Sequence, residues 1–407
     1  MPNLAIAGGE PLVRQRLGSP WPVSGDLEQR AVMEVVASAK WGRSAHATPA
    51  DSRVGQFEAA FAQFQDARYA LGVSNGTVAI EVALRASGVR AGDEVVMPAA
   101  AFVSVATAVV NCGAVPVFVD VDPRTYLIDP AEAEAAIGAR TRAILAVDNG
   151  GLPCDMDALN DIATRRGVAV VSDCAHSHGS QWKGVGAGAL GRVGAFSFQQ
   201  GKLLSCGEGG MVVTNDEEVA GLMDAYHHVG GVPGRPGRGT PVVSLACRMT
   251  EFQGAVGLAQ LSRLKGQTET RERNLTYLNE GLREIAGVAP IHRDPRVTRW
   301  GFYLVHFRFI SEQFGGVSRD TFRKALAAEG VPAGVGHTQP LYRHPIFAGQ
   351  PGLKRACPQT ERISETESWS LGHAVFLGPT SDMDLILDAV RKLRRNVDEL
   401  RAVEKGL

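Results

Sequence analysis

The segment Val168-Ala169-Val170-Val171-Ser172-Asp173 is an apolar run of strand length that ends in a carboxylate. Similar short apolar runs recur from Tyr69 onward, and segments with helical spacing separate them. Strands that alternate with helices favour a mostly parallel sheet covered by helices on both faces. We therefore expect an α/β fold whose strands include Tyr69–Ser74, Glu94–Met97, Val115–Val119, Ala143–Val147, Val168–Ser172 and Ala195–Phe198.

The chain is expected to have three parts. Residues 1–40 are interrupted by Trp21-Pro22 and predict an N-terminal arm, residues 41–262 predict a large domain, and residues 263–407 predict a smaller C-terminal α/β domain. In the large domain we expect helices at Phe57–Phe64, from Asn75 to Ser87, and at Phe102–Val110. Beyond it we expect a strand at Trp300–Phe309 and helices at Phe252–Leu264, Gln267–Ile285, Ser318–Glu329 and Met383–Val403.

Composition excludes several classes of partner. The chain has 42 basic and 43 acidic residues and no long block of either sign, so nothing favours nucleic acid or an anionic membrane as a ligand. The N-terminus lacks a signal-peptide pattern, and the apolar runs are too short to span a bilayer. The six cysteines form no CxxC pair, which is typical of reduced thiols in the cytoplasm. We expect a cytoplasmic protein.

Lys202 lies 29 positions after Asp173, in the loop Ser197–Gly210, which is rich in serine and glycine. A lysine amine can form a Schiff base with the aldehyde of pyridoxal 5'-phosphate (PLP). A carboxylate beside the pyridinium nitrogen keeps that nitrogen protonated, so the ring can accept electrons. Open α/β sheets bind ligands at the carboxyl ends of their strands, which is where Asp173 is expected. The pair predicts a PLP enzyme.

A phosphate site is expected where the first strand meets its helix, at Asn75-Gly76-Thr77. Free backbone amides at a helix start, the absence of a side chain on Gly76 and the Thr77 hydroxyl all suit a phosphate. An ordinary helix cap would use similar residues, and it is the presence of Lys202 that favours phosphate. Ser197 offers a further hydroxyl to the phosphate, and His176 is expected near the ring hydroxyl or the substrate.

Three other motifs do not carry their usual function. His176-Ser177-His178 has no matched set of cysteines or carboxylates, so we expect no metal site. Gly186–Gly191 fits GxGxxG but follows a polar stretch and precedes no clear helix. Gly201-Lys202 lacks the upstream glycine and the following Ser/Thr of a P-loop. We expect no nucleotide site at either glycine motif.

From about Trp21 to near its C-terminus, the sequence resembles the DegT/StrS family of sugar and cyclitol aminotransferases, which are fold-type I PLP-dependent transferases. Parts of it are most similar to members that act on scyllo-inosose, and others to 3-amino-5-hydroxybenzoate synthases. The segments that carry the resemblance are Ser74–Thr77, Gly92–Val95, Val117–Asp122, Asp173–Gly179, Ser197–Gly210 and Arg248–Gln253.

The resemblance implies a role for each matched residue. Lys202 would be the Schiff-base lysine and the catalytic acid/base, with Asp173 as the pyridinium partner and His176 as a third catalytic candidate. Phe102 would stack on the ring. The implied cofactor-binding set is Asn75, Gly76, Thr77, Phe102, Asp173, Ser197, Gln199 and Lys202. Family members are homodimers with shared active sites, so a homodimer is expected. The retained lysine argues against the family's sugar dehydratases, in which a histidine replaces it.

Four departures from the family pattern fall around the expected pocket. Val147-Asp148-Asn149-Gly150-Gly151 replaces a Val-His-Leu/Met-x-Gly strand end, and Ala100-Ala101 replaces an aromatic/Thr pair. Ala246 replaces an asparagine that contacts the phosphate from the neighbouring subunit, and His227 replaces an arginine. We interpret these changes as retained PLP chemistry on an altered substrate. The candidate substrate pocket is Asp148, Asn149, His227, Tyr342 and His344.

The expected reaction is transfer of an amino group from L-glutamine or L-glutamate to a keto-sugar or keto-cyclitol. One alternative is a PLP-dependent lyase, dehydratase or aromatising synthase that acts on a cyclic substrate with the same cofactor. Another is a non-catalytic PLP-binding protein, for which the sequence offers no helix-turn-helix or basic patch.

Overall fold

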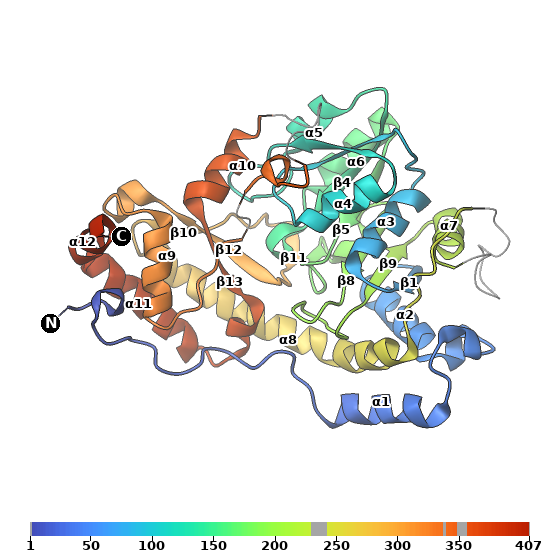
Figure 1. Ribbon diagram of the computed structural model, residues 1–407, viewed down its shortest axis with the longest axis horizontal. Coiled ribbons are helices and arrows are strands. Elements are labelled where there is room, and N and C mark those ends of the chain that lie inside the picture. Colours follow the sequence, from blue (N-terminus) through green and yellow to red (C-terminus); the bar gives the residue numbers. More distant parts are fainter. Residues whose placement is uncertain (1, 229–241, 337–338, 348–355, 407) are drawn as a thin grey trace.

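The computed structural model describes residues 2–228, 242–336, 339–347 and 356–406. A seven-stranded sheet with the order β1-β9-β8-β5-β4-β2-β3 forms the centre of the larger part of the molecule (Figure 1). Its members are β1 (Tyr69–Val73), β2 (Glu94–Pro98), β3 (Val115–Val119), β4 (Thr141–Val147), β5 (Ala169–Asp173), β8 (Val193–Ser197) and β9 (Gly210–Thr214). All six predicted strands are present, and the mostly parallel α/β fold is confirmed.

The patterns did not predict β9. It runs antiparallel to both β1 and β8, whereas β8, β5, β4, β2 and β3 are parallel to one another. Its apolar run begins at the end of Gly207–Gly210, a cluster that favours a turn. The strand was missed because its first residue belongs to this cluster. The strand returns the chain from the Lys202 loop into the sheet.

Both faces of the sheet are covered because side chains alternate along each strand. Val95 and Met97 pack with α3 (Gly76–Ala86), α4 (Val103–Asn111) and α7 (Glu217–His227). Val96, between them, packs toward α5 (Pro130–Ala136) and α6 (Met156–Arg166). A continuously apolar strand is what two covered faces require, which is why the central strands read as uninterrupted apolar runs.

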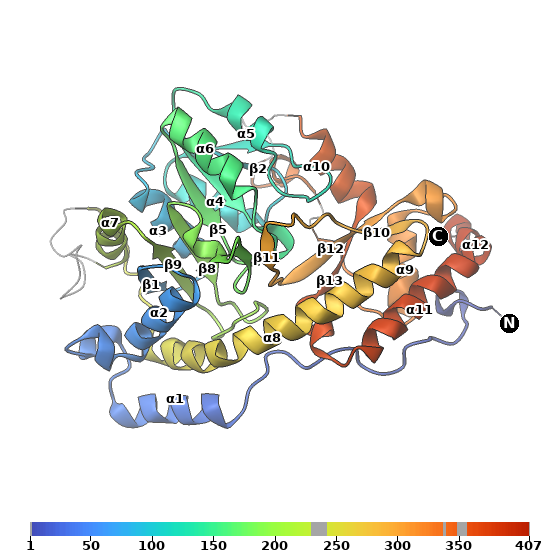
Figure 2. The ribbon, with the colours of Figure 1, turned by 180° about the vertical axis from the view of Figure 1, so that it is seen from behind.

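Helix α8 (Glu251–Arg283) extends from the large sheet to the C-terminal part, packed along its first half by α1 (Asp26–Ser38) and α2 (Arg53–Phe64) (Figure 2). The prediction of two helices here was wrong. Gly266 does not end the helix, because buried side chains continue on one face through Leu264, Thr268, Leu275 and Leu278. The boundary expected at residue 262 falls inside α8. We propose that the two domains divide within this helix.

The N-terminal segment is more ordered than an arm that lacks structure. Helix α1 begins with a capping interaction from Glu28, whose carboxylate also pairs with Arg263 of α8. The residues before α1 extend to the far end of the molecule. There Asn3 donates hydrogen bonds to Glu399 at 3.2 Å and to Asn396 at 3.0 Å. The N-terminus therefore lies beside the C-terminal helices (Figures 1 and 2).

The C-terminal part is built on a three-stranded sheet, β10 (Val288–Pro290), β12 (Leu304–Phe309) and β13 (Ser368–Gly372), with α9 (Arg319–Ala328) and α10 (Pro358–Arg362). The expected strand begins at Leu304, not Trp300. The expected C-terminal helix is two helices, α11 (Ser381–Arg395) and α12 (Val397–Gly406), which are interrupted at Asn396. A small third sheet joins β11 (Val297–Arg299), β6 (Gln181–Trp182) and β7 (Val185–Gly186).

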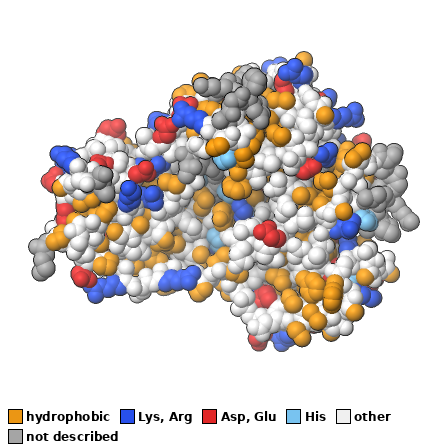
Figure 3. Space-filling view, viewed as in Figure 1, with side chains coloured by type: hydrophobic (Ala, Val, Ile, Leu, Met, Phe, Trp, Pro, Cys, Tyr) orange, Lys and Arg blue, Asp and Glu red, His pale blue; other side chains and the backbone are white. Residues whose placement is uncertain are grey.

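Two surface properties bear on function. None of the described helices combines the length and the apolar composition needed to cross a membrane. On the face in Figure 3, basic and acidic side chains are interspersed among apolar ones, without a broad field of one sign over the described surface.

Candidate active site

One cavity lies where three strands end and two helices begin. It has a volume of about 750 Å³ and adjoins the carboxyl ends of β4, β5 and β8 and the N-termini of α3 and α4. Parallel strands bring their carboxyl ends to one edge of a sheet, so residues distant in sequence meet there. The selected residues that line the cavity are Asn75, Gly76, Thr77, Phe102, Asp148, Asn149, Asp173, His176, Ser197, Gln199 and Lys202.

The start of α3 offers two backbone donors to a ligand. Asn75 is the N-cap, and its side chain accepts a hydrogen bond from the Val78 amide at 2.9 Å. The Asn75 carbonyl accepts a hydrogen bond from the Ala79 amide. The amides of Gly76 and Thr77, at the first turn of the helix, lie at the cavity and can donate to a ligand. A Cβ on Gly76 would lie 2.5 Å from the Ser197 Cβ, so only glycine lets α3 approach β8 this closely. The arrangement is an anion cradle.

Lys202 and Asp173 face the same space from two different segments. Asp173 ends β5, is buried, and accepts the Ala175 amide at 3.0 Å. Burial raises the pKa of the Asp173 carboxyl, although the Ala175 amide and the Lys202 charge oppose that rise. Burial lowers the pKa of Lys202 to about 8, against the opposing effect of Asp173. A large share of the lysine amine is thus neutral near pH 8, as a proton acceptor must be.

The loop that carries Lys202 is held by backbone hydrogen bonds. The Gln199 side chain accepts the Gly201 amide at 2.8 Å, and the Gln199 carbonyl accepts the Lys202 amide at 2.8 Å. From the N-terminal arm, Trp21 donates its indole N–H to the Gln200 carbonyl at 3.0 Å. From the C-terminal part, His373 Nε2 lies 2.9 Å from the Gly201 carbonyl. Three separate parts of the chain therefore fix the position of one amine.

Aromatic rings border the cavity on two sides. Phe102 is the N-cap of α4 and keeps 63% of its surface exposed, so its face is available to a flat ligand. Across the site, Tyr303 packs against His176 with ring centroids 4.9 Å apart, and the Lys202 Nζ lies 4.2 Å from the Tyr303 centroid. The cavity therefore combines an anion cradle, a buried carboxylate, a partly neutral amine and flat walls.

Comparison with known proteins identifies the family that has this arrangement. Residues 26–391 match the DegT/DnrJ/EryC1/StrS aminotransferase family. The chain belongs to this family. The aminotransferase is 36% identical to an L-glutamine:scyllo-inosose aminotransferase of Streptomyces griseus, over 98% of this chain and 99% of the relative. It is also 36% identical to a 3-amino-5-hydroxybenzoate synthase of Amycolatopsis mediterranei, over 91% of this chain and 97% of the relative.

A solved structure agrees with both sequence relatives. The crystal structure of 3-amino-5-hydroxybenzoic acid synthase superposes on this aminotransferase with a TM-score of 0.82 at 34% identity. The match covers 92% of this chain and 98% of that one. The protein is a PLP-dependent aminotransferase of fold-type I, as the resemblance implied.

The residues around the cavity fit the cofactor of this aminotransferase. The cradle that a Cβ at position 76 would fill suits the cofactor phosphate. The Asp173 carboxylate can pair with the ring nitrogen, and the Lys202 amine can react with the aldehyde. When bound, PLP supplies an electron sink for the electron pair left when a proton departs from the carbon next to the amine. Asp148 and Asn149 line the same cavity and remain for a substrate.

Asp148 lies in the inner wall, at the end of β4 beside Asp173. Its carboxylate accepts the Ser177 hydroxyl at 2.7 Å and the Cys154 amide at 3.1 Å, and burial raises its pKa to about 7. Its neighbour Asn149 accepts a hydrogen bond from His306, with the Asn149 Oδ1 3.1 Å from the His306 Nε2. The carboxyl and amide that depart from the family pattern therefore sit inside the site.

Three selected residues do not line the cavity. His227 ends α7 and is fully buried. Its carbonyl accepts a hydrogen bond from the Cys247 amide at 3.3 Å. Tyr342 packs near Phe118 and donates its hydroxyl to Glu361 at 2.6 Å. His344 accepts the Ile346 amide at 3.3 Å. In this chain the three residues lie outside the cavity and pack against their own surroundings, and their assignment to the substrate pocket stays a prediction.

The structure also adds residues that sequence reasoning missed. Tyr303 was assigned to a strand, although Trp300–Tyr303 is irregular and turns its tyrosine into the cavity. His178, part of the dismissed metal motif, is fully buried and contacts the Ser197 carbonyl at 2.7 Å through Nε2. Trp21 and His373 act on the lysine loop from both ends of the chain. Only the tertiary fold brings these segments together.

Proposed function

We propose that this aminotransferase moves the amino group of L-glutamine or L-glutamate to a keto-cyclitol or a keto-sugar. The observation that carries the proposal is the convergence of Lys202, Asp173 and the Gly76 and Thr77 amides on one cavity of about 750 Å³. Such a volume suits a cofactor with a small cyclic substrate. The relative of Streptomyces griseus named for L-glutamine and scyllo-inosose supports both the donor and the acceptor class.

In this proposal each side chain has one task. Lys202 would hold the cofactor through its amine and, once free, would move a proton from the donor Cα. Asp173 would pair with the ring nitrogen, whose charge would offset the cost of burying the carboxylate. Phe102 would lie against the cofactor ring. The amides of Gly76 and Thr77, with the Ser197 hydroxyl, hold the phosphate end.

The remaining polar groups would meet the substrate. His176 lines the cavity beside Tyr303, and Asp148 and Asn149 line its inner wall. A cyclitol or sugar presents several hydroxyls that need partners when water is excluded, which carboxyl, amide and imidazole groups supply. The keto acceptor therefore finds polar partners near Lys202.

We also propose a homodimer in which a second subunit completes the site. Phe102 keeps 63% of its surface exposed beside the cavity, so this side of the site is open for a second subunit to cover. Light scattering coupled to size exclusion should give twice the mass of the 43.2 kDa chain. A monomer with full activity would contradict the shared site.

The test of the function is an absorption spectrum followed by product analysis. The purified holoenzyme should show the visible band of lysine-bound PLP, and L-glutamine or L-glutamate should replace it with a near-ultraviolet band. Adding scyllo-inosose should then restore the visible band and yield an aminated cyclitol and a keto acid in equal amounts. A visible band that responds to neither donor would exclude both of them.

A second candidate is an aromatising synthase or lyase, which the similarity to a 3-amino-5-hydroxybenzoate synthase and the altered residues Asp148 and Asn149 favour. Such an enzyme would convert a cyclic substrate without releasing a keto acid from an amino donor. The ratio of keto acid to product therefore separates it from transamination. A non-catalytic PLP-binding protein would show the visible band and no turnover with any amine.

A further inference from the structure

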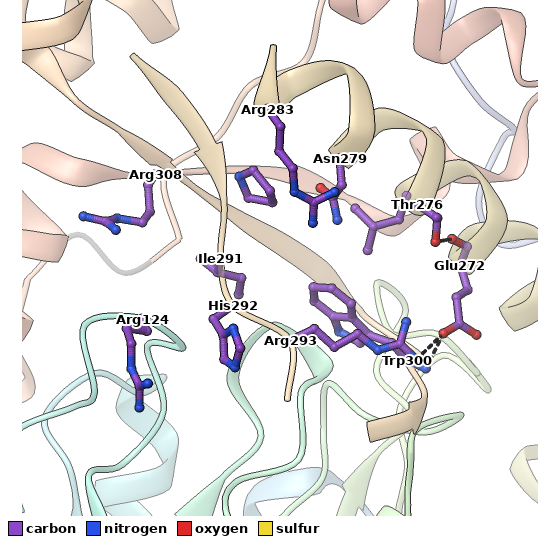
Figure 4. Close-up of a pocket in the computed structure, with 12 residues that line it drawn as sticks. Arg124, Glu272, Thr276, Asn279, Arg283, Ile291, His292, Arg293, Trp300 and Arg308 are labelled. Atoms are coloured by element: carbon purple, nitrogen blue, oxygen red, sulfur yellow. Dashed lines mark hydrogen bonds and ion pairs between the residues drawn. The ribbon is translucent and has the colours of Figure 1, made fainter. Parts of the chain in front are cut away.

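A second hollow, here called the arginine cleft, lies apart from the cofactor cavity and shares no lining residue with it. It has a volume of about 470 Å³ and is bordered by the second half of α8, the segment after β10, and the turn after β3. Figure 4 shows its polar side chains projecting from these separate elements. Its charged and titratable lining is Arg124, Glu272, Arg283, His292, Arg293 and Arg308.

One face of α8 supplies a wall of the arginine cleft. Glu272, Thr276, Asn279 and Arg283 all line it, and their spacing of four, three and four residues places them on one side of a helix. The Thr276 hydroxyl is already bonded to the Glu272 carbonyl at 2.9 Å. The groups that α8 leaves for a ligand are therefore the Asn279 amide and the Arg283 guanidinium.

The positive charges of the arginine cleft exceed the carboxylates that neutralise them. Three of its arginines each pair with one carboxylate, and the pairs are Arg124–Asp122 at 2.7 Å, Arg293–Glu272 at 2.7 Å and Arg308–Glu367 at 2.6 Å. Arg283 differs, because no hydrogen bond or ion pair joins its guanidinium to another described residue. The unneutralised charge of the cleft is therefore centred on Arg283.

The paired arginines also keep donors for a ligand. A guanidinium carries five N–H groups in a fixed fork. Arg308 uses its Nε toward Glu367, so the nitrogens at its tip are not engaged by that ion pair. A phosphate accepts several such donors at once, and arginine forks match its geometry better than an ammonium does.

Asn279 places an acceptor beside these donors. Its Oδ1 is buried and has no hydrogen-bond partner among the described residues. A buried amide oxygen normally accepts a hydrogen bond. A ligand hydroxyl held beside the arginines would supply the donor. A fully ionised anion such as sulfate cannot satisfy this oxygen, because it carries no O–H group to donate. The ligand is therefore expected to carry a hydroxyl as well as a charge.

We propose that the arginine cleft is a binding site for a phosphorylated polyol, which is a second site beyond the proposed transaminase function. The phosphate would contact Arg283 and the free nitrogens of the neighbouring guanidiniums, and a hydroxyl of the same molecule would donate to the Asn279 Oδ1. Trp300 lines this cleft, and its indole donates to the Gly150 carbonyl at 2.9 Å. Gly150 directly follows Asn149 in the cavity.

The test uses the PLP-saturated holoenzyme, so that the cradle of the active site is already occupied. Titration calorimetry with sulfate and with glycerol 3-phosphate measures binding to the intact chain, Arg283→Ala and Arg273→Ala. Arg273 is a matched control, because it is exposed on the same helix and does not line the cleft. We expect Arg283→Ala to weaken both probes about tenfold, as the loss of a charge-assisted hydrogen bond does. The control should bind both as the parent does.

Asn279→Ala separates the two halves of the ligand. It should weaken glycerol 3-phosphate and leave sulfate unchanged, because only the former has a hydroxyl for the Oδ1. Equal weakening by Arg283→Ala and Arg273→Ala would mean general surface charge and overturn the site. So would the absence of binding to the parent holoenzyme at millimolar probe. None of these results depends on turnover, so the transaminase proposal stands or falls separately.

Discussion

The two walls of the active-site cavity are built in different ways. The cofactor wall consists of Asn75-Gly76-Thr77, Ser197 and Lys202, which follow directly from strand ends and helix starts. The substrate wall joins Asp148 and Asn149 to Tyr303 and Leu304, which come from the C-terminal part. Local backbone geometry makes the first wall, and contacts between distant segments make the second.

The difference teaches which substitutions alter which property. In the cofactor wall the proposed phosphate contacts are backbone amides and a short hydroxyl, so a change that moves the backbone there is expected to affect the cofactor. In the substrate wall, residues are held by partners on other elements. The Asn149 side chain contacts His306, and the Tyr303 backbone amide donates to the His176 carbonyl at 3.2 Å. That wall can change its chemistry while the cofactor set remains, which agrees with the departures found at Asp148 and Asn149.

The strongest effect is expected from Lys202→Ala. The variant loses both the attachment of the cofactor and the amine that moves the proton, so turnover should fall by more than about 10⁴-fold. Keto acid release from L-glutamine or L-glutamate measures it. Lys183→Ala is the control, because that lysine is exposed and pairs with Asp157 at 2.7 Å. Persistent transamination in Lys202→Ala would remove this lysine from the mechanism.

Gly76→Ala should weaken the cofactor wall without removing any polar group. The new Cβ would meet the Ser197 Cβ at 2.5 Å, so α3 must shift away from β8 and its amides with it. We expect PLP affinity to fall about 10- to 100-fold, which corresponds to losing one charge-assisted hydrogen bond. Equilibrium binding of PLP to the stripped enzyme measures the change.

A second glycine provides the control for that experiment. A Cβ on Gly138 would have Glu94 Oε2 as its nearest neighbour, at 3.7 Å, which is an ordinary contact. Gly138→Ala should therefore bind PLP as the parent does. If Gly76→Ala also binds PLP normally, the close approach of α3 to β8 is not what positions the phosphate.

The cofactor wall could be predicted from the sequence because its signals are local. Each signal can be interpreted from a short segment without the rest of the chain. These signals are a strand that ends in Asp173, a turn at Asn75-Gly76-Thr77 and a lysine in a glycine-rich loop. The six central strands were predicted for the same reason. The strand β9 was missed because its first residue belongs to a turn-like glycine cluster.

Only part of the substrate wall could be predicted in the same way, because Asp148 and Asn149 follow a strand end whereas Tyr303 has no such local signal. Tyr342 and His344 are polar residues in a loop of the C-terminal part, where pocket residues are often found. Tyr342 instead packs beside Phe118 of the large sheet. Tyr303, which does line the cavity, lies in an apolar stretch that reads as strand. Which of these faces the site depends on how the two parts of the chain dock, and no short pattern encodes that.

Asp148→Asn tests the buried carboxyl of the substrate wall. Burial raises the pKa of Asp148 to about 7, from an unfolded value of about 3.9. Between those values the folded state binds more protons than the unfolded state, so this group lowers stability as pH rises from about 4 to 7. The asparagine removes that loss and keeps partners for Ser177 and Cys154. The difference between pH 5 and pH 8 should shrink by about 2 kcal/mol.

Denaturant unfolding of the PLP-free protein at the two pH values measures this prediction. Asp161→Asn is the control, because that carboxylate is exposed on α6 and pairs with Arg165 at 3.0 Å. Its pH dependence should match the parent's. An unchanged pH dependence in Asp148→Asn would show that Asp148 is ionised in the folded protein at pH 5, and its environment would then be polar, not buried.

The smallest effect concerns neither wall but the helix that joins the two parts of the chain. Gly266 lies inside α8 with no atom within 4 Å of a Cβ placed there, so Gly266→Ala adds a methyl group to open space. Alanine loses less backbone entropy than glycine in a helix, and stability should rise by about 0.5–1 kcal/mol. Denaturant unfolding measures it. A loss of stability instead would place a break at Gly266, and the two domains would then divide at a hinge and not within a continuous helix.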